Sequence, residues 1–118
     1  MNSQQTTAAS PTEEQARIFL DAWRVAIHLT EHPKLFGGNP AAGLNGFAPK
    51  VKEIARALPT LPKSQSALIA ALVSFYNPEE GAKMMTKVGI CGLGALSLAI
   101  KEPARAALAD LIYSYQGW

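Results

Sequence analysis

The placement of prolines constrains the fold of this chain more than any other feature of its sequence. Residues 10–13 read Ser-Pro-Thr-Glu, a capping box in which the serine oxygen accepts a free backbone N–H and the glutamate reaches back to the cap. Residues 77–80 read Asn-Pro-Glu-Glu and repeat this start signal, and Pro103 marks a further start. Proline suits the first position of a helix, where its missing N–H has no helical partner. The chain therefore contains several helix starts.

Apolar residues follow these starts with the spacing of helices rather than of strands. No stretch alternates apolar and polar residues over more than a few positions, and no internal repeat occurs. We predict an all-α fold, a compact bundle of about five to six helices that forms a single domain over residues 11–118. A short disordered tail at residues 1–10 precedes it. The predicted helices cover residues 11–31, 49–58, 64–76 and 103–116, with another that starts at residue 78.

The C-terminal third leaves one ambiguity. Residues 84–100 fit either one long helix or two helices broken near Gly89. The uncharged apolar run at residues 88–100 predicts a buried core helix, with Cys91 as an inert core residue. Small residues in this run are expected to let helices approach closely, at Gly89, Gly92, Gly94 and Ala95. The residues of the last helix that are expected to face inward are Ala107, Leu108, Leu111, Ile112 and Tyr115.

Composition excludes several classes of protein. Hydrophobic residues make up 48% of the 118 residues and charged residues 17%, which excludes an intrinsically disordered or polybasic chain. One cysteine allows neither an intramolecular disulfide nor a cysteine-based zinc cluster. The longest apolar run is shorter than the roughly 20 residues of a membrane-spanning helix. The first ten residues contain no basic residue and no apolar run, so a cytoplasmic location is expected.

A metal-site motif occurs at residues 28–32, which read His-Leu-Thr-Glu-His. This string matches H-x-x-E-H, in which two histidines one helical turn apart bind zinc and the glutamate activates its water. Glu102 could formally supply a third ligand, but Pro33 disfavours helical geometry at His32. The alternative is a solvated helix end with histidine near the negative end of the helix dipole. We therefore keep His28 and His32 as weak metal candidates and predict no cofactor.

A glycine-rich string at residues 88–97 resembles a dinucleotide-binding turn. In that motif a strand leads into glycines whose backbone N–H groups approach a pyrophosphate at a helix start. Asp110 lies near where the ribose-binding acid belongs, but it falls within a predicted helix, and no β-α-β unit surrounds the string. A nucleotide or small-molecule site at the segment Gly89–Gly94 stays a further alternative, to be decided by whether residues 88–91 form a strand.

The one charge asymmetry lies in the middle of the chain. Residues 32–63 carry five basic residues against one acidic residue, a net charge of +4. This stretch could bind an anion or nucleic acid, although its footprint is small for a DNA-binding domain. The other interpretation is a solvated helix face. The candidate anion-binding residues are Lys50, Lys52, Arg56 and Lys63.

Large apolar residues exceed what a small bundle comfortably hides, and no catalytic motif accompanies them. The sequence has no P-loop and no nucleophile elbow, and its paired acids fall at helix starts. We predict a non-enzymatic, regulatory or protein–protein interaction protein that self-associates, with another protein or a second copy as its partner and a homodimer as the expected form. The predicted interaction residues are Leu35, Phe36, Leu44 and Phe47 in the long connection and Tyr113, Tyr115 and Trp118 near the C-terminus.

Overall fold

A long amphipathic helix opens the part of the chain that the structure, a computed structural model, describes, which is residues 11–118. This helix, α1, spans Pro11–Leu29. Phe19, Trp23 and Ile27 recur at intervals of four residues and are buried along one face. The predicted disordered tail and its capping residue Ser10 lie outside the described residues.

The end of α1 lies two residues before the predicted end at residue 31. Thr30 is completely buried, and its Oγ1 donates a hydrogen bond to the carbonyl oxygen of Ile27 at 2.6 Å. The same oxygen accepts a hydrogen bond from the backbone N–H of His32 at 3.1 Å. Glu31 has a φ of 65°, a left-handed conformation that no α-helix continues. The chain therefore turns sharply here.

The long connection after α1 packs against the helices through two 3-10 segments, η2 (Pro33–Leu35) and η3 (Pro40–Phe47). The indole Nε1 of Trp23 donates a hydrogen bond to the carbonyl oxygen of Phe47 at 2.8 Å. Gly46 leaves no room for a side chain, because a Cβ there would collide with the backbone carbonyl of Asn39. This connection is therefore part of the body of the protein.

Helix α3 forms the centre of the core. It spans Lys63–Tyr76, and all its residues from Ser66 to Val73 are buried. A helix that is apolar on all sides is stable only when other elements surround it. The chain reaches it through α2 (Val51–Ala57) and the 3-10 turn η4 (Leu58–Thr60).

The predicted second helix, at residues 49–58, begins two residues late, at Val51. Pro49 is paired with Phe36 in an isolated β-bridge, and the backbone N–H of Lys50 donates to the carbonyl oxygen of Leu35 at 2.8 Å. These contacts hold the backbone in an extended conformation before the helix can start. Tertiary pairing has therefore moved the boundary.

Helix α4 (Pro78–Lys87) begins at the start signal that the sequence predicts. The side-chain oxygen of Asn77 accepts a hydrogen bond from the backbone N–H of Glu80 at 3.2 Å, as a helix N-cap does. One turn later, Gly81 lies so close to α3 that a Cβ would collide with the backbone of Ser74. Gly81 therefore allows close contact between α4 and α3.

Residues 84–100 belong to two helices that are separated by a turn at Gly89. The prediction of one buried core helix over residues 88–100 is therefore wrong. Gly89 ends α4 with a φ of 81°, and the backbone N–H of Ile90 donates to the carbonyl oxygen of Met85 at 2.8 Å. This is a Schellman motif, which favours glycine at its left-handed position. The next helix, α5, spans Leu93–Ala99. Cys91, which was predicted to be buried, is exposed between the two helices.

The expected close approach is wrong at Gly92 and Gly94, where an added Cβ would meet no atom within 4 Å. Ala95, the remaining small residue of this set, is half-buried and packs against the core. The buried contacts of this segment are Leu96 on α5 and Ile100 directly after it.

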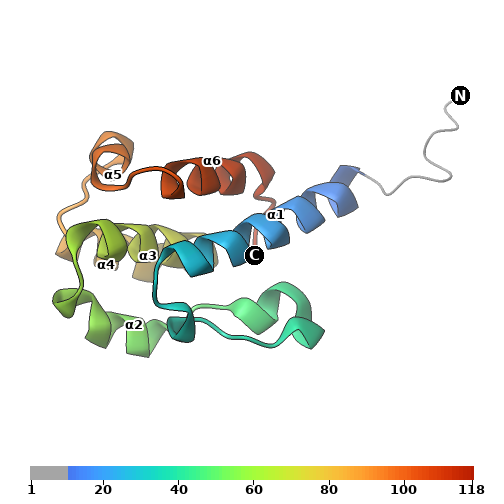
Figure 1. Ribbon diagram of the computed structural model, residues 1–118, viewed down its shortest axis with the longest axis horizontal. Helices are drawn as coiled ribbons and strands as arrows, with labels where there is room; N and C mark the ends of the chain where they lie inside the picture. Colours follow the sequence, from blue (N-terminus) through green and yellow to red (C-terminus); the bar gives the residue numbers. More distant parts are fainter. Residues whose placement is uncertain (1–10) are drawn as a thin grey trace, which may run out of the picture.

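Helix α6 (Ala104–Ser114) completes the bundle and is shorter than the predicted 103–116. It packs on α1, while α3 packs on α4. In Figure 1, α5 and α6 lie along the upper edge of the molecule and α2 lies along the lower edge, with α1, α3 and α4 between them. Ile112, which was predicted to face inward, is 57% exposed, and Tyr115 is 38% exposed.

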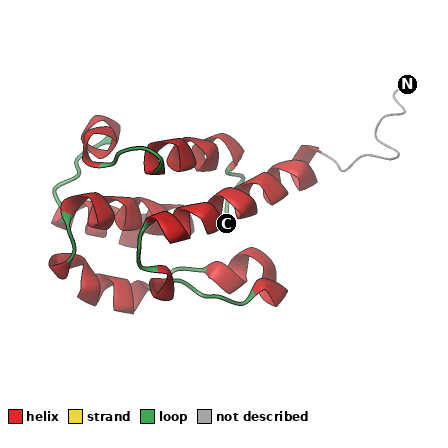
Figure 2. Ribbon diagram, viewed as in Figure 1, coloured by secondary structure: helices red, strands yellow, loops and turns green. Residues whose placement is uncertain are grey.

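The predicted fold class is confirmed. Residues 11–118 form an all-α bundle with six α-helices and no strand. Figure 2 shows these residues as helices joined by loops. Around the buried face of α1, aromatic rings from distant segments meet, with Trp23 against Trp118 at 4.9 Å and Phe75 against Tyr115 at 5.1 Å between ring centroids. Within the described residues, none of the helices has the length and apolar character that crossing a membrane requires.

Candidate functional site

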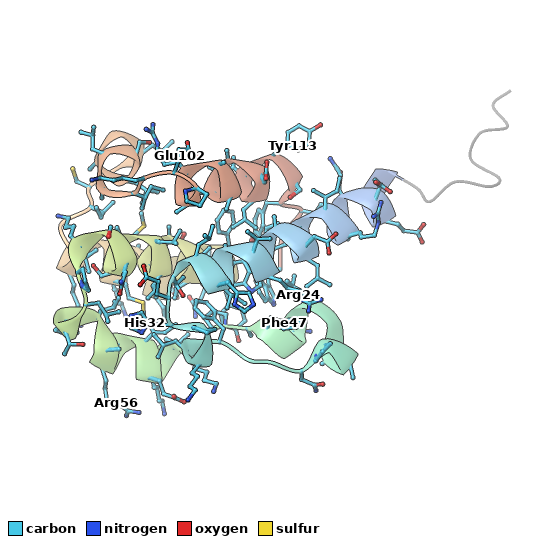
Figure 3. The ribbon with its side chains drawn as sticks, in the orientation of Figure 1. Arg24, His32, Phe47, Arg56, Glu102 and Tyr113 are labelled. Carbon is cyan, nitrogen blue, oxygen red and sulfur yellow. The ribbon has the colours of Figure 1, made fainter. Side chains whose placement is uncertain are left out.

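The predicted interaction residues of the long connection are mostly inside the molecule. Phe36 is 2% exposed and stands edge-on to Trp23, and Phe47 is 9% exposed. The guanidinium of Arg24 covers the Phe47 ring at 5.0 Å from its centroid (Figure 3). Leu35 and Leu44 are half-buried against the same core. Phe36 and Phe47 therefore belong to the core and offer little side-chain surface to a partner.

The predicted aromatic residues near the C-terminus separate into two kinds. Trp118 is half-buried against Trp23, and its Nε1 donates a hydrogen bond to Oδ1 of Asn45 at 2.8 Å. The hydroxyl of Tyr115 donates to the carbonyl oxygen of Phe75 at 2.8 Å. Tyr113 has no such contact and is 78% exposed, and in Figure 3 it points away from the body. Tyr113 is therefore the most exposed of these three residues.

The two histidines of the metal-site motif do not share one helix face. His28 is exposed on α1, whereas His32 follows the turn at Glu31 and its Nε2 lies 2.7 Å from Oε1 of Gln65. His28 and Glu102 do line one shallow cleft of about 370 Å³, but His32 is not among its lining residues. Among residues 11–118, no group of three or more histidine, cysteine or acidic side chains could hold a metal ion.

The glycine-rich segment lacks the strand that a dinucleotide-binding turn requires. Residues 88–91 form the turn after α4, and the helix that follows is only seven residues long. Asp110 lies on α6, as predicted, and not at the end of a strand. Because residues 88–91 form a turn and not a strand, the structure does not favour a dinucleotide site at the segment Gly89–Gly94.

The four candidate anion-binding residues are all exposed. Within residues 11–118, none of them forms an ion pair, since both ion pairs found there involve other residues. Lys50, Lys52 and Arg56 lie at the start of α2 or on it. Figure 3 shows Arg56 at the lower edge of the molecule. Lys63 begins α3, and its Nζ lies beside Gly89 at the far end of α4. The set is therefore divided between two places.

Within residues 11–118, one side chain has a shifted pKa, and it lies outside these sites. A hydrogen bond from the Arg17 guanidinium to the Glu14 carboxylate, together with their opposite charges, raises the pKa of Arg17. Both side chains are exposed near the start of α1. Because arginine is charged at every physiological pH, this shift has no chemical consequence.

An apolar groove of the described surface runs between α1 and α6. It has a volume of about 480 Å³, and its floor is apolar, with Val25 54% exposed in it. Two carboxylates, Asp21 and Asp110, come from the two helices that form its walls. The remaining lining residues are Ile18, Ala22, Leu29, Pro103, Ala106 and Ala107.

A second apolar groove, of about 260 Å³, lies on the other side of α6, between α6 and α5. Leu93 is 73% exposed and Ile112 is 57% exposed, and both line it. Arg105 is its one charged lining residue. Leu98 on α5 is 87% exposed as well. We refer to Leu93, Leu98, Ile112 and Tyr113 as the α5–α6 surface.

Prediction from the sequence missed three members of the α5–α6 surface. Leu93 and Leu98 belong to an apolar run that was assigned to the core, and Ile112 was assigned to the inward face of α6. A signal was present in α6, where apolar residues cover more than the one stripe of a helix that is buried on one side only. Leu111 and Ile112 are adjacent in sequence and cannot both point inward.

Comparison with known proteins adds no relative: the chain matches no family model, no curated protein and no solved structure.

Proposed function

We propose that this protein is a non-enzymatic interaction protein that self-associates through the α5–α6 surface. One observation supports the proposal above all others. Four of the seven large hydrophobic side chains that are exposed in residues 11–118 lie on α5 and α6, which are neighbouring helices. Two of them, Leu93 and Ile112, line one groove between these helices. Apolar side chains exposed on one surface are typical of protein–protein interfaces.

The energetic reason is the hydrophobic effect. Each Å² of apolar surface removed from water contributes about 25 cal/mol, so burial of several leucine, isoleucine and tyrosine side chains provides a driving force for association. Tyr113 adds a large contact area with few rotatable bonds, which lowers the entropic cost of ordering it. A second copy of the chain carries the same apolar surface and can cover it reciprocally.

Sedimentation equilibrium over a range of protein concentrations tests the proposal. We expect the wild type to form a dimer or higher oligomer as concentration rises, and we expect the double variant Leu93→Ser/Ile112→Ser to remain monomeric. Val25→Ser is the matched control, because Val25 is 54% exposed and Ile112 is 57% exposed. A wild type that stays monomeric at every concentration contradicts the proposal. Loss of association in Val25→Ser alone would place the interface in the α1–α6 groove and also contradict it.

An alternative function is anion or nucleic-acid binding by the basic residues of α2. Lys52 and Arg56 are one helical turn apart, are exposed and are free of ion pairs within the described chain. Binding of a nucleic acid through phosphates must weaken steeply as salt rises. Titration of a labelled duplex at two salt concentrations, with Lys52→Ala/Arg56→Ala as the comparison, tests this alternative.

The expected cytoplasmic location is part of the leading proposal, and the single cysteine is compatible with a reducing compartment.

A further inference from the structure

The outward side of α6 is an apolar face without a partner in the monomer. Ala106, Ala109 and Tyr113 are exposed along it, at the spacings of three and four that place residues on one face. The opposite side of the helix contacts the core. The buried residues there are Ala107, Leu108, Leu111 and Ser114.

This face has the sequence pattern of a helix that pairs with another helix. In the seven-residue notation a to g, Ala106 and Tyr113 occupy a positions and Ala109 occupies the d position. Arg105 then falls at g and Asp110 at the following e position, so the two opposite charges flank the apolar face on its two sides. Both side chains are exposed, and neither forms an ion pair within residues 11–118.

We propose that α6 pairs in parallel with α6 of a second copy of this chain, with Arg105 of each copy facing Asp110 of the other. This inference rests on the proposed self-association and adds its geometry. The dimer axis runs along α6, which lies at the upper edge of the molecule in Figure 1. Tyr113 of one copy meets Tyr113 of the other across this axis.

The charges select the parallel orientation. In parallel helix pairs, a g residue faces the e residue five positions later on the partner, which brings Arg105 to Asp110 twice, once in each direction. In antiparallel pairs, g residues face g residues and e residues face e residues. Asp110 would then lie near Asp110 of the other copy, which is repulsive. The charges of this face are therefore complementary to a second copy of the same helix, and they favour the parallel direction.

The side chains also set how closely the helices approach and how tightly they bind. Alanine at positions 106 and 109 allows an axis separation near the lower end of the usual range of about 8–10 Å. The paired segment is short, because α6 has 11 residues. We therefore expect a weak dimer that forms at high protein concentration, in which Tyr113 and Ile112 supply most of the apolar contact.

Charge exchange tests this geometry. We expect Arg105→Asp and Asp110→Arg each to raise the dimer Kd about tenfold at low salt, because each change places like charges opposite one another twice in the dimer. The double variant Arg105→Asp/Asp110→Arg should recover the wild-type Kd. An equimolar mixture of the two single variants should also recover association, as a heterodimer with both ion pairs restored.

Matched controls come from α2, at the opposite edge of the molecule. Lys52→Asp and Glu53→Arg make the same changes of charge on exposed positions and should leave the dimer Kd unchanged. Circular dichroism melting of each variant identifies any loss of folding. A monomeric wild type contradicts the proposed function and this inference together. A wild type that associates, with a Kd that none of the charge exchanges alters, contradicts this inference alone and places the interface elsewhere.

A cysteine placed on the axis tests direction independently of charge. In a Cys91→Ser background, Ala106→Cys lies opposite its own copy in a parallel pair, within the Cα separation of about 4–7 Å that a disulfide requires. We expect a covalent dimer on a non-reducing gel after mild oxidation. The wild type, whose exposed Cys91 lies outside α6, is the control and should remain a single chain. Failure of Ala106→Cys to cross-link in an associating protein would overturn the parallel pairing.

Discussion

At the residue scale, Glu31 and Gly81 affect stability in opposite ways: the backbone conformation of Glu31 is unfavourable, and the missing side chain of Gly81 permits a favourable contact. Glu31 adopts a φ of 65°, which costs a residue with a Cβ about 1–2 kcal/mol. Gly81 is the reverse case, because its lack of a side chain allows α4 to contact the backbone of Ser74 on α3. Neither position is evident from the sequence. Residue 31 is a glutamate although its backbone conformation favours glycine, and residue 81 is a glycine although it lies in a helix, where glycine is disfavoured.

Glu31→Gly should stabilise the protein. Glycine removes the left-handed penalty but loses more chain entropy on folding, so the free energy of unfolding should rise by about 0.5–1 kcal/mol. Urea denaturation measures this change. His28→Gly, inside α1, is the control and should lower the same free energy by about 1 kcal/mol. A fall for Glu31→Gly would show that the turn is not strained.

Gly81→Ala should destabilise the protein strongly for so small a change. The added methyl group meets backbone atoms of Ser74, which cannot rotate away, so we expect a loss of about 2–3 kcal/mol in denaturant titration. Gly94→Ala on α5 adds the same methyl group where no atom lies within 4 Å. That control should change stability by no more than about 1 kcal/mol, in the stabilising direction. Equal losses for both variants would contradict the close contact.

At the element scale, the segment after α6, residues 115–118, packs across the bundle and contacts several helices. Trp118 contacts Trp23 on α1 and Tyr76 on α3, at 4.9 and 5.0 Å between ring centroids. Gln116 donates a hydrogen bond to the carbonyl oxygen of Thr12 at 2.9 Å. The last residues of the chain therefore hold together elements that are distant in sequence, although they belong to no helix themselves.

Trp118→Ala should lower the free energy of unfolding by about 2–3 kcal/mol, since it removes a half-buried aromatic side chain and its hydrogen bond to Asn45. Thermal unfolding followed by circular dichroism measures the loss. Tyr113→Ala is the control at low protein concentration, because a side chain that is 78% exposed contributes less than about 0.5 kcal/mol to the monomer. A similar loss of unfolding free energy in both variants would contradict the prediction that Trp118 stabilises the monomer and Tyr113 does not.

At the scale of the whole molecule, apolar contact dominates both the interior and the proposed interface. Only 17% of residues are charged, and residues 11–118 contain just two ion pairs, both of them exposed. Exposed ion pairs contribute about 0–1 kcal/mol each. Stability therefore comes from the core around α3, and association is expected to draw on the apolar residues left outside it.

Self-association links stability to concentration. A dimer that binds only folded chains raises the melting temperature as protein concentration increases. We expect the wild-type Tm to rise between about 5 and 500 μM, and we expect Leu93→Ser/Ile112→Ser to melt at one temperature throughout this range. Scanning calorimetry at several concentrations measures the effect. A wild-type Tm that is independent of concentration argues against a dimer of folded chains.

Local signals were sufficient to predict most of the helix starts, but not the start of α5. Capping residues, prolines and glycines act within one turn of the backbone, so the start at Pro78 could be located without knowledge of the rest of the molecule. Boundaries moved wherever a distant segment supplied a partner, as Leu35 does for the backbone of Lys50. Periodicity also matches burial in α1, where Phe19, Trp23 and Ile27 recur every four residues and form one buried stripe.

The candidate site was less predictable, since exposure depends on what packs against each face. Phe36 and Ile112 are both large and apolar, yet Phe36 is covered by Trp23 and Ile112 is left in a groove open to solvent. The sequence by itself determined that the chain is helical and where five of its six α-helices start, to within two residues, because those signals are local. Only the tertiary structure decided which apolar residues form the core and which remain on the α5–α6 surface, because burial depends on neighbours that are distant in sequence.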